Sequence, residues 1–376
     1  MEVMNTLRKA LFRALEKSDL NMLRAVLAQG VSLAYEAGDP DPVCFAAAHT
    51  VSDLAMLQCL HDAGADVKAR EPQYQDSLLH WAVKAEDDRI LPWLIEQGLD
   101  VNAVNARSRT PLFFAVPAMA VYAEPDELIV SVRDIQVLLA AGASVNVIDA
   151  DTSTPLRQAA IAGAAEVVAV LLSHGADVHA RRADGCTALH LIGLLAPDDI
   201  RDSHLAVIDQ LLATGADLEA RDEDGWTPLI AAAAHNNLPV FEHLLQRGAD
   251  PEAGDGNVLR LLMIEGSDPL LDRLLGEDVA IDRPFGDEVL RPLGVAAHNG
   301  YLYGVQTLLD RGADIEAETI DGETALLMAV RKREHDVVAH LLSRGANRHH
   351  ADHYNNTPLS WAQRRGDARL IELLSA

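Results

Sequence analysis

Histidines and cysteines are the residues of this sequence whose types and spacing could most readily do chemistry. His349, His350 and His353 lie close together in NRHHADH, and imidazole nitrogens are good zinc ligands. No second set of ligands is spaced to complete a four-coordinate site, so we expect no metal there. The three cysteines are isolated and form no CxxC pair, which indicates neither a disulfide framework nor a zinc site.

Signatures of catalytic sites are absent from the sequence. It contains no GxxxxGK[ST], GxGxxG, HExxH or GxSxG motif. The sequence therefore lacks the motif expected of a phosphate-loop protein, a dinucleotide enzyme, a zinc peptidase or a serine hydrolase. We expect a protein that is not an enzyme and needs no cofactor.

The charge of the chain restricts its partners. Its 57 acidic and 31 basic residues give a formal charge of −26, which repels nucleic acids and anionic lipids and favours a basic protein partner. The longest uncharged stretch, Thr110–Ala123, is too short to span a bilayer. We expect a cytoplasmic protein, monomeric on its own, with no membrane segment. The abundance of Ala, Leu, Arg and Asp and the scarcity of Lys favour a bacterial source.

One short pattern recurs along the chain and predicts helices. In TPLIAA, Thr227 can cap a helix that begins at Pro228, and Gly248 marks where the following helix ends. Similar starts occur at Ser77, Thr110, Thr154, Thr187, Thr227, Arg291, Thr324 and Thr357. Glycines that end helices follow at Gly30, Gly64, Gly98, Gly142, Gly175, Gly215, Gly248, Gly312 and Gly345, and the most frequent spacings between them are 33 and 34. In the one long gap, Asp278 is expected at the glycine position.

This period, with TPLH-like starts and G-A-D-V-N-A-like ends, resembles the ankyrin repeat over nearly the whole chain. The resemblance implies an all-α solenoid of antiparallel helix pairs with projecting β-hairpin fingers. We expect one solenoid over residues 1–376, of about eleven units. Residues 1–38 and 353–376 cap an internal array over 39–352, which has insertions near 117–133 and 193–203 and a degenerate unit at 252–285. His80 and His190, in the fourth place of the TPLH-like turns, are expected to tie adjacent repeats by hydrogen bonds.

The resemblance also locates the surface expected to bind a partner, because in this family the fingers and first helices line a concave face. The residues at the finger tips and just before the TPL-like turn are mostly acidic and include aromatic side chains, a composition typical of binding hot spots steered by charge. They are Tyr74, Asp76, Arg107, Arg109, Asp151, Asp184, Glu223, Asp224, Trp226, Asp287, Glu288, Leu290, Asp321, Glu323 and Tyr354.

Two functions fit this surface. The first is a non-catalytic protein-interaction scaffold that binds a basic partner. The alternative is a bacterial immunity or inhibitor protein that neutralises a basic toxin or nuclease, or a secreted ankyrin effector. The acids at the tips could instead serve only solubility. The charge is uneven, because residues 331–376 hold eight Lys or Arg and five Asp or Glu. This basic end could bind an acidic segment or simply form a soluble cap.

Overall fold

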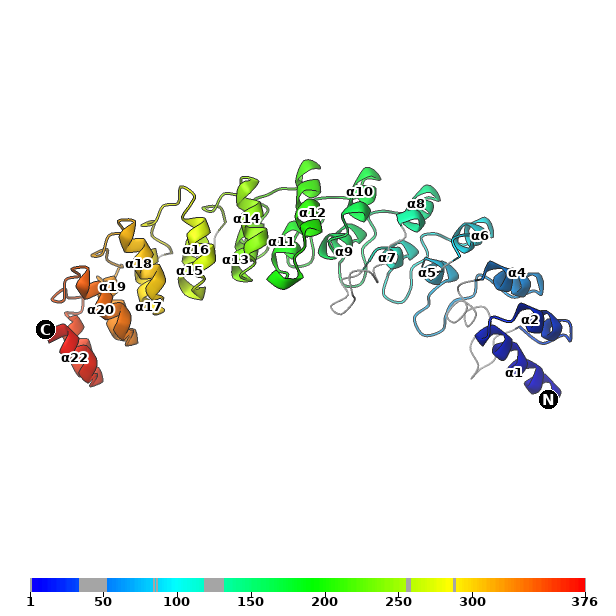
Figure 1. The fold of residues 1–376 in the computed structure, drawn as a ribbon, viewed down its shortest axis with the longest axis horizontal. Coiled ribbons are helices and arrows are strands. Elements are labelled where there is room, and N and C mark those ends of the chain that lie inside the picture. The colour runs from blue at the N-terminus through cyan, green and yellow to red at the C-terminus, as the bar shows by residue number, and fades with distance from the viewer. Residues whose placement is uncertain are drawn as a thin grey trace. The chain divides into compact units, whose positions relative to one another are not determined.

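The computed structural model describes residues 2–33, 53–83, 85, 87–117, 132–254, 258–286 and 289–375. The chain divides into two compact units, each a stack of short helices (Figure 1). Unit 1 comprises Met1–Ala183 and Asp202–Ala216, and unit 2 comprises Asp184–Arg201 and Asp217–Ala376. The all-α fold predicted from the repeats is confirmed.

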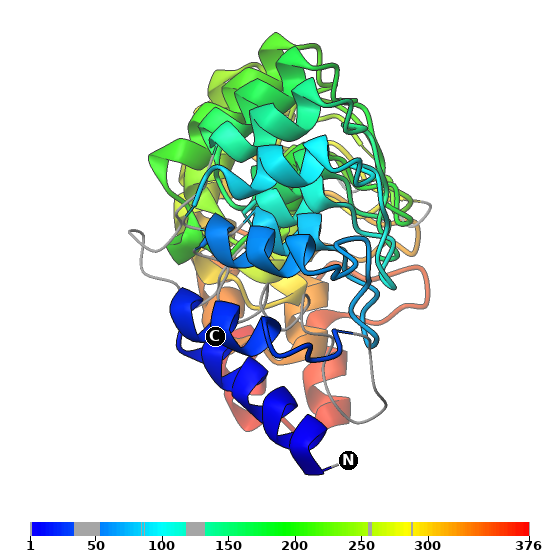
Figure 2. The ribbon, with the colours of Figure 1, turned by 90° about the vertical axis from the view of Figure 1, so that its right-hand side faces the viewer.

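Unit 1 is built from consecutive antiparallel pairs in which one helix packs on its partner and on the equivalent helix of the next pair. Figure 2 shows the loops between its pairs gathered on one side of the helices. Its helices are α1 (Glu2–Glu16), α2 (Leu20–Leu27), α4 (Leu54–Asp62), α5 (Leu78–Ala82), α6 (Ile90–Glu96), α7 (Pro111–Ala115), α8 (Val132–Ala140), α9 (Pro155–Ile161), α10 (Ala165–Ser173) and α12 (Asp202–Ala213).

Unit 2 repeats the same arrangement. The inner helices α13, α15, α17, α19 and α21 pack in that order, and each contacts the outer helix that follows it. Its helices are α11 (Ala188–Gly193), η2 (Pro197–Asp199), α13 (Pro228–Ala234), α14 (Leu238–Gln246), α15 (Val258–Glu265), α16 (Asp268–Leu274), α17 (Pro292–His298), α18 (Leu302–Asp310), α19 (Ala325–Lys332), α20 (His335–Ser343), α21 (Pro358–Arg365) and α22 (Ala368–Ser375).

The helix boundaries follow from the residues that mark them. The Thr227 hydroxyl accepts a hydrogen bond from the Ile230 backbone N–H, and α13 begins at Pro228 as predicted. Gly248 has a φ of +91°, a left-handed conformation in which a side chain would be strained. Between these marks the helices bury Ala, Leu, Val and Ile, whose small or branched side chains allow the short helices to pack closely.

The fingers are turns rather than extended ribbons. In five of them the backbone N–H of one residue donates to the carbonyl of the residue four positions later, as from Asn105 to Arg109 and from Asp222 to Trp226. Among the described residues the only β-pairing is an isolated antiparallel bridge between Phe285 and Leu290. A single bridge does not make a β-ladder. The expected β-hairpins are therefore present only as hairpin-like turns.

The two irregular regions differ in how far the structure describes them. Residues 118–131, most of the first predicted insertion, lie outside the described residues. The second insertion contains the short helix η2. In the degenerate unit, α15 packs between α13 and α17 as its neighbours do. Asp278 does not take the left-handed backbone of the glycines that it was expected to replace.

In the described part of the chain, no helix combines the length and the apolar character that a membrane crossing requires.

Candidate protein-binding surface

Four of the fingers are each held by a polar side chain at the base. The Asp149 carboxylate accepts from the backbone N–H groups of Asp151 and Ser153, at 3.0 and 2.8 Å. Asp222 accepts from Asp224 and Trp226 in the same way, as do Asn105 and Asp352 in their own fingers. These capping residues, which sequence reasoning missed, fix the loop conformation because they satisfy its backbone donors.

Adjacent fingers are also joined to one another within each unit. In unit 1, Ala106 N–H donates to the Tyr74 carbonyl at 2.7 Å, and Ala150 N–H donates to the Arg107 carbonyl at 3.0 Å. In unit 2, Glu223 N–H donates to the Asp184 carbonyl at 3.0 Å. His353 N–H donates to the Asp321 carbonyl at 2.9 Å. The tips are therefore ordered before any partner binds, which lowers the entropy cost of association.

In unit 1, the predicted site residues at the tips are exposed, whereas those before the TPL-like turn are not. Tyr74 is 46% exposed, and Arg107 and Asp151 are exposed as well. Asp76 is instead 5% exposed and accepts from the Asn105 side chain at 2.8 Å. Arg109 is half-buried, and its guanidinium is 2.9 Å from the buried Asp149 carboxylate. Asp76 and Arg109 thus join neighbouring fingers and do not display free charges.

Unit 2 divides in the same way. Glu223 and Asp224 are exposed at one tip, and Asp184 is half-buried at the tip before it. Trp226 and Leu290, which precede their TPL-like turns, are both half-buried. The row of large exposed aromatic side chains predicted from the sequence is therefore shorter than expected.

The last two fingers of unit 2 bring two exposed predicted residues together. Tyr354 is 69% exposed and its hydroxyl donates to the Asp321 carboxylate at 3.3 Å. The Asp321 charge raises the pKa of Tyr354, so the phenol stays protonated. Glu323, in contrast, is 9% exposed and forms an ion pair with Arg331 at 2.5 Å. Asp287 and Glu288 lie outside the described residues.

Beneath these fingers, unit 2 contains a groove of about 440 Å³. Its floor and sides include α15, α17 and α19, and its rim is the finger before α19. Ile264 and Ile320 project into it with 44% and 59% of their surface exposed, and Leu290, Val295 and Met328 line it too. Sequence reasoning missed this groove because its walls come from three repeats. In the sequence, two of the residues that form it, Ile264 and Ile320, lie 56 positions apart, in an inner helix and in a finger.

The histidines of the TPLH-like turns serve structure, as predicted. His80 Nδ1 accepts from the Ser77 backbone N–H at 3.0 Å, so Nε2 carries the proton and donates to the Arg109 carbonyl at 3.0 Å. His190 makes the same bonds to Thr187 and to the Trp226 carbonyl. Burial lowers the pKa of His80, which keeps the ring neutral. Each histidine connects a helix start to the next finger.

The histidine cluster of NRHHADH forms no grouping that could hold a metal within the described residues. His350 Nε2 instead lies 2.9 Å from the Gly322 carbonyl of the preceding finger.

Comparison with known families finds ankyrin repeats along the chain. Models described as "Ankyrin repeats (3 copies)" match residues 200–255 and 293–376. Models described as "Ankyrin repeats (many copies)" match residues 138–192 and 79–117.

Individual relatives share the repeats over part of their length. An ankyrin repeat-containing protein of Treponema pallidum is 27% identical over 148 residues, which cover 39% of this chain and 50% of that protein. Human "Ankyrin repeat and SOCS box protein 18" is 32% identical over 138 residues, 27% of this chain and 30% of the relative. The chain thus spans half or less of these relatives.

Among solved structures, the human ASB11 ankyrin repeat domain is similar with a TM-score of 0.50 and 24% identity. The match covers 59% of this chain and 97% of that domain, and it speaks for the fold alone.

Proposed function

Because the chain belongs to the ankyrin repeat family, whose repeats generally mediate protein–protein interactions, we propose that it binds a partner protein through its fingers and inner helices. The proposed partner surface is basic where it meets the finger tips of unit 2. The tips of Glu223, Asp224 and Asp321, with Tyr354 beside Asp321, carry this proposal.

Three properties of these tips support binding rather than solubility alone. Their backbones are fixed by capping side chains and by bonds between fingers. The exposed Tyr354 ring offers apolar area and a hydroxyl at little entropic cost, which is typical of hot spots. Exposed carboxylates steer a basic partner and raise its association rate, an effect that weakens with added salt.

A peptide-display selection tests this proposal directly. Wild-type protein and a tip variant, Glu223→Gln/Asp224→Asn/Asp321→Asn/Tyr354→Ala, would each select from a library of random twelve-residue peptides. We expect peptides rich in Lys and Arg to bind the wild type and to be lost on the tip variant.

The matched control is Glu166→Gln/Asp278→Asn/Glu372→Gln, which removes three exposed carboxylates away from these tips. It should retain the same peptides. Equal loss on both variants would mean that only the overall charge matters, and retention on the tip variant would refute the assignment to the tips. Capture of a single basic toxin or nuclease in a one-to-one complex would narrow the function to an inhibitor.

A further inference from the structure

The inner helices at the end of unit 2 carry charge opposite to that of the chain. The helices α17, α19 and α21 pack side by side in sequence and end in His298, Lys332 and Arg365. Arg331 and Arg364 precede the last two of these. The structure records no ion pair for Lys332 or Arg365 with any described residue, and both side chains are exposed.

The pKa of His298, at the end of α17, is sensitive to the positive charges at the end of the neighbouring helix α19. Burial lowers the pKa of His298, and the charges of Lys332 and Arg331 lower it further. Arg331 is partly neutralised by Glu323, whereas Lys332 has no recorded ion pair with a carboxylate in the described part of the chain. Cations at helix C-termini also interact favourably with the helix dipole. The dipole accounts for the cations but not for the apolar surface beside them.

An apolar surface adjoins these cations on both sides. His298 and Arg331 line the 440 Å³ groove into which Ile264 and Ile320 project. Two carboxylates line it as well, those of Glu323, which is paired with Arg331, and of Asp321 on the rim. On α21, the Arg364 guanidinium lies 4.9 Å from the centre of the half-buried Trp361 ring, and that of Arg365 lies 6.0 Å from it. Apolar area flanked by cations suits a ligand with an apolar side chain close to carboxylates.

We propose that this surface of unit 2 binds an acidic peptide segment of a partner protein. An apolar side chain of the segment would enter the groove between Ile264 and Ile320, and its Asp or Glu residues would contact Lys332 and Arg365. The groove volume falls within the range of small-ligand sites and accommodates a bulky aliphatic or aromatic side chain.

A peptide fits this surface better than a nucleic acid does. The cations cover only the ends of α19 and α21, while the chain as a whole has a charge of −26 that repels a polyphosphate. An acidic peptide needs only a few local charges, and the groove gives its apolar side chain a site that a phosphate backbone would leave empty.

This inference adds a second contact of opposite charge to the proposed function. It depends on protein binding but not on a basic partner at the finger tips. The two proposals can therefore fail separately. The tip variant tests the binding of basic peptides, whereas the variants of the groove and its cations test the binding of acidic peptides.

The test is a selection from the same twelve-residue peptide library with two further variants. Lys332→Glu/Arg365→Glu reverses the charges, and Ile264→Asp/Ile320→Asp makes the groove polar at two exposed positions. We expect the wild type to select peptides that combine an apolar residue with Asp or Glu. Synthesised as fluorescent probes, these should bind at least about tenfold more weakly to either variant in anisotropy titrations.

The control variant, Arg348→Glu/Arg369→Glu, makes the same charge change elsewhere in the last repeats and should bind these probes like the wild type. The tip variant also removes the Asp321 carboxylate from the rim of the groove, so it should bind these probes at least as tightly as the wild type. The proposal is overturned if no such peptide is selected, if the charge-reversed variant binds unchanged, or if a single-stranded twelve-nucleotide DNA binds more tightly than the peptides. A circular dichroism spectrum and melting curve of each variant would establish that unit 2 remains folded.

Discussion

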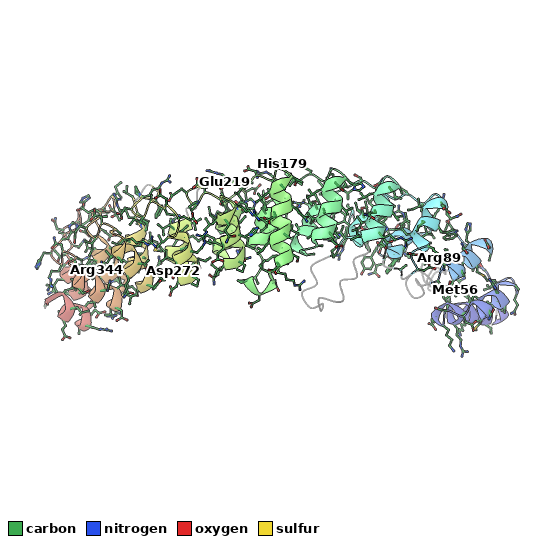
Figure 3. The ribbon with its side chains drawn as sticks, turned by 45° about the horizontal axis from the view of Figure 1, so that its top comes forward. Met56, Arg89, His179, Glu219, Asp272 and Arg344 are labelled. Carbon is green, nitrogen blue, oxygen red and sulfur yellow. The ribbon has the colours of Figure 1, made fainter. Side chains whose placement is uncertain are left out.

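Replacing Glu219 by Asn should stabilise the protein. In Figure 3, Glu219 is labelled on the loop after α12, where its Oε1 accepts from the Asp250 backbone N–H at 2.8 Å. The other oxygen, Oε2, is buried without a hydrogen-bond partner. At the same repeat position in unit 1, Asn146 accepts from the Asp177 N–H at 2.8 Å and also donates to the Gly175 carbonyl at 3.0 Å. A carboxylate cannot make that second bond.

The magnitude follows from these two differences. A neutral hydrogen bond gained inside a folded protein contributes about 1 kcal/mol. Burial, together with the charges of Asp250 and Asp217, raises the pKa of Glu219, so its ionised form opposes folding at neutral pH. We expect Glu219→Asn to raise the free energy of unfolding by about 1 kcal/mol at pH 7. The melting temperature should rise by about 2–4 °C.

The pH dependence separates the two contributions. Because the folded-state pKa is raised, the native side chain takes up a proton more readily than the unfolded one as the pH falls. The charge penalty is thus present at pH 7 and disappears below the ordinary glutamate pKa of 4.5. Urea denaturation at pH 7 and pH 4 should show the larger Asn advantage at pH 7. Glu219→Gln, which removes only the charge, is the control. A loss of stability at pH 7, or an advantage that does not change with pH, would refute this reasoning.

Three other variants test contacts between neighbouring repeats. Arg333 has a φ of 68° where other repeats have glycine, so Arg333→Gly should be more stable than Arg333→Ala by about 1 kcal/mol in urea denaturation, since both lose the ion pair to Asp367. Asn237 is fully buried and donates to the Leu195 carbonyl at 3.0 Å, so Asn237→Ala should cost about 2–4 kcal/mol and lower the urea midpoint. His80 has a lowered pKa, so the unfolded state binds its proton first and stability should fall as the pH drops below about 6.5. The slope of that fall, measured from pH 7.5 to 5, should be smaller in His80→Gln.

The sequence predicted the helix starts and ends well because these depend on neighbouring residues. At Thr154, Thr227 and Thr357 a Thr before a Pro caps the helix by accepting a backbone hydrogen bond, and glycine after a helix turns left-handed for a similarly local reason. Thr227, Pro228 and Gly248 behave as predicted. Asp278 does not take the left-handed backbone expected at a glycine position.

Exposure within the fingers was harder to predict because it depends on register between loops that are distant in sequence. Asp151 and Asp76 are both acids of a finger, yet Asp151 is exposed and Asp76 faces the next finger. The finger of Asp76 closes over five positions, from Glu71 N–H to the Asp76 carbonyl, whereas that of Asn105 closes over four. In both fingers the residue before the TPL-like turn, Asp76 or Arg109, faces the adjacent finger, whereas Asp151 lies at a tip.

This difference changes how the charge of the chain should be interpreted. Asp149, Asp222 and Asp352 cap fingers. Another set of carboxylates accepts backbone N–H groups of the following repeat: Glu219, Glu252, Asp282 and Glu316. Acids of both kinds are fixed by the fold and would be present whatever the protein binds. The net charge therefore overstates how strongly the protein should attract a basic partner. The charges that indicate a partner are those that bind no other group within the fold. In the described part of unit 2 these include the exposed tip acids Glu223 and Asp224 and the cations Lys332 and Arg365, which is why the two surfaces should select peptides of opposite charge.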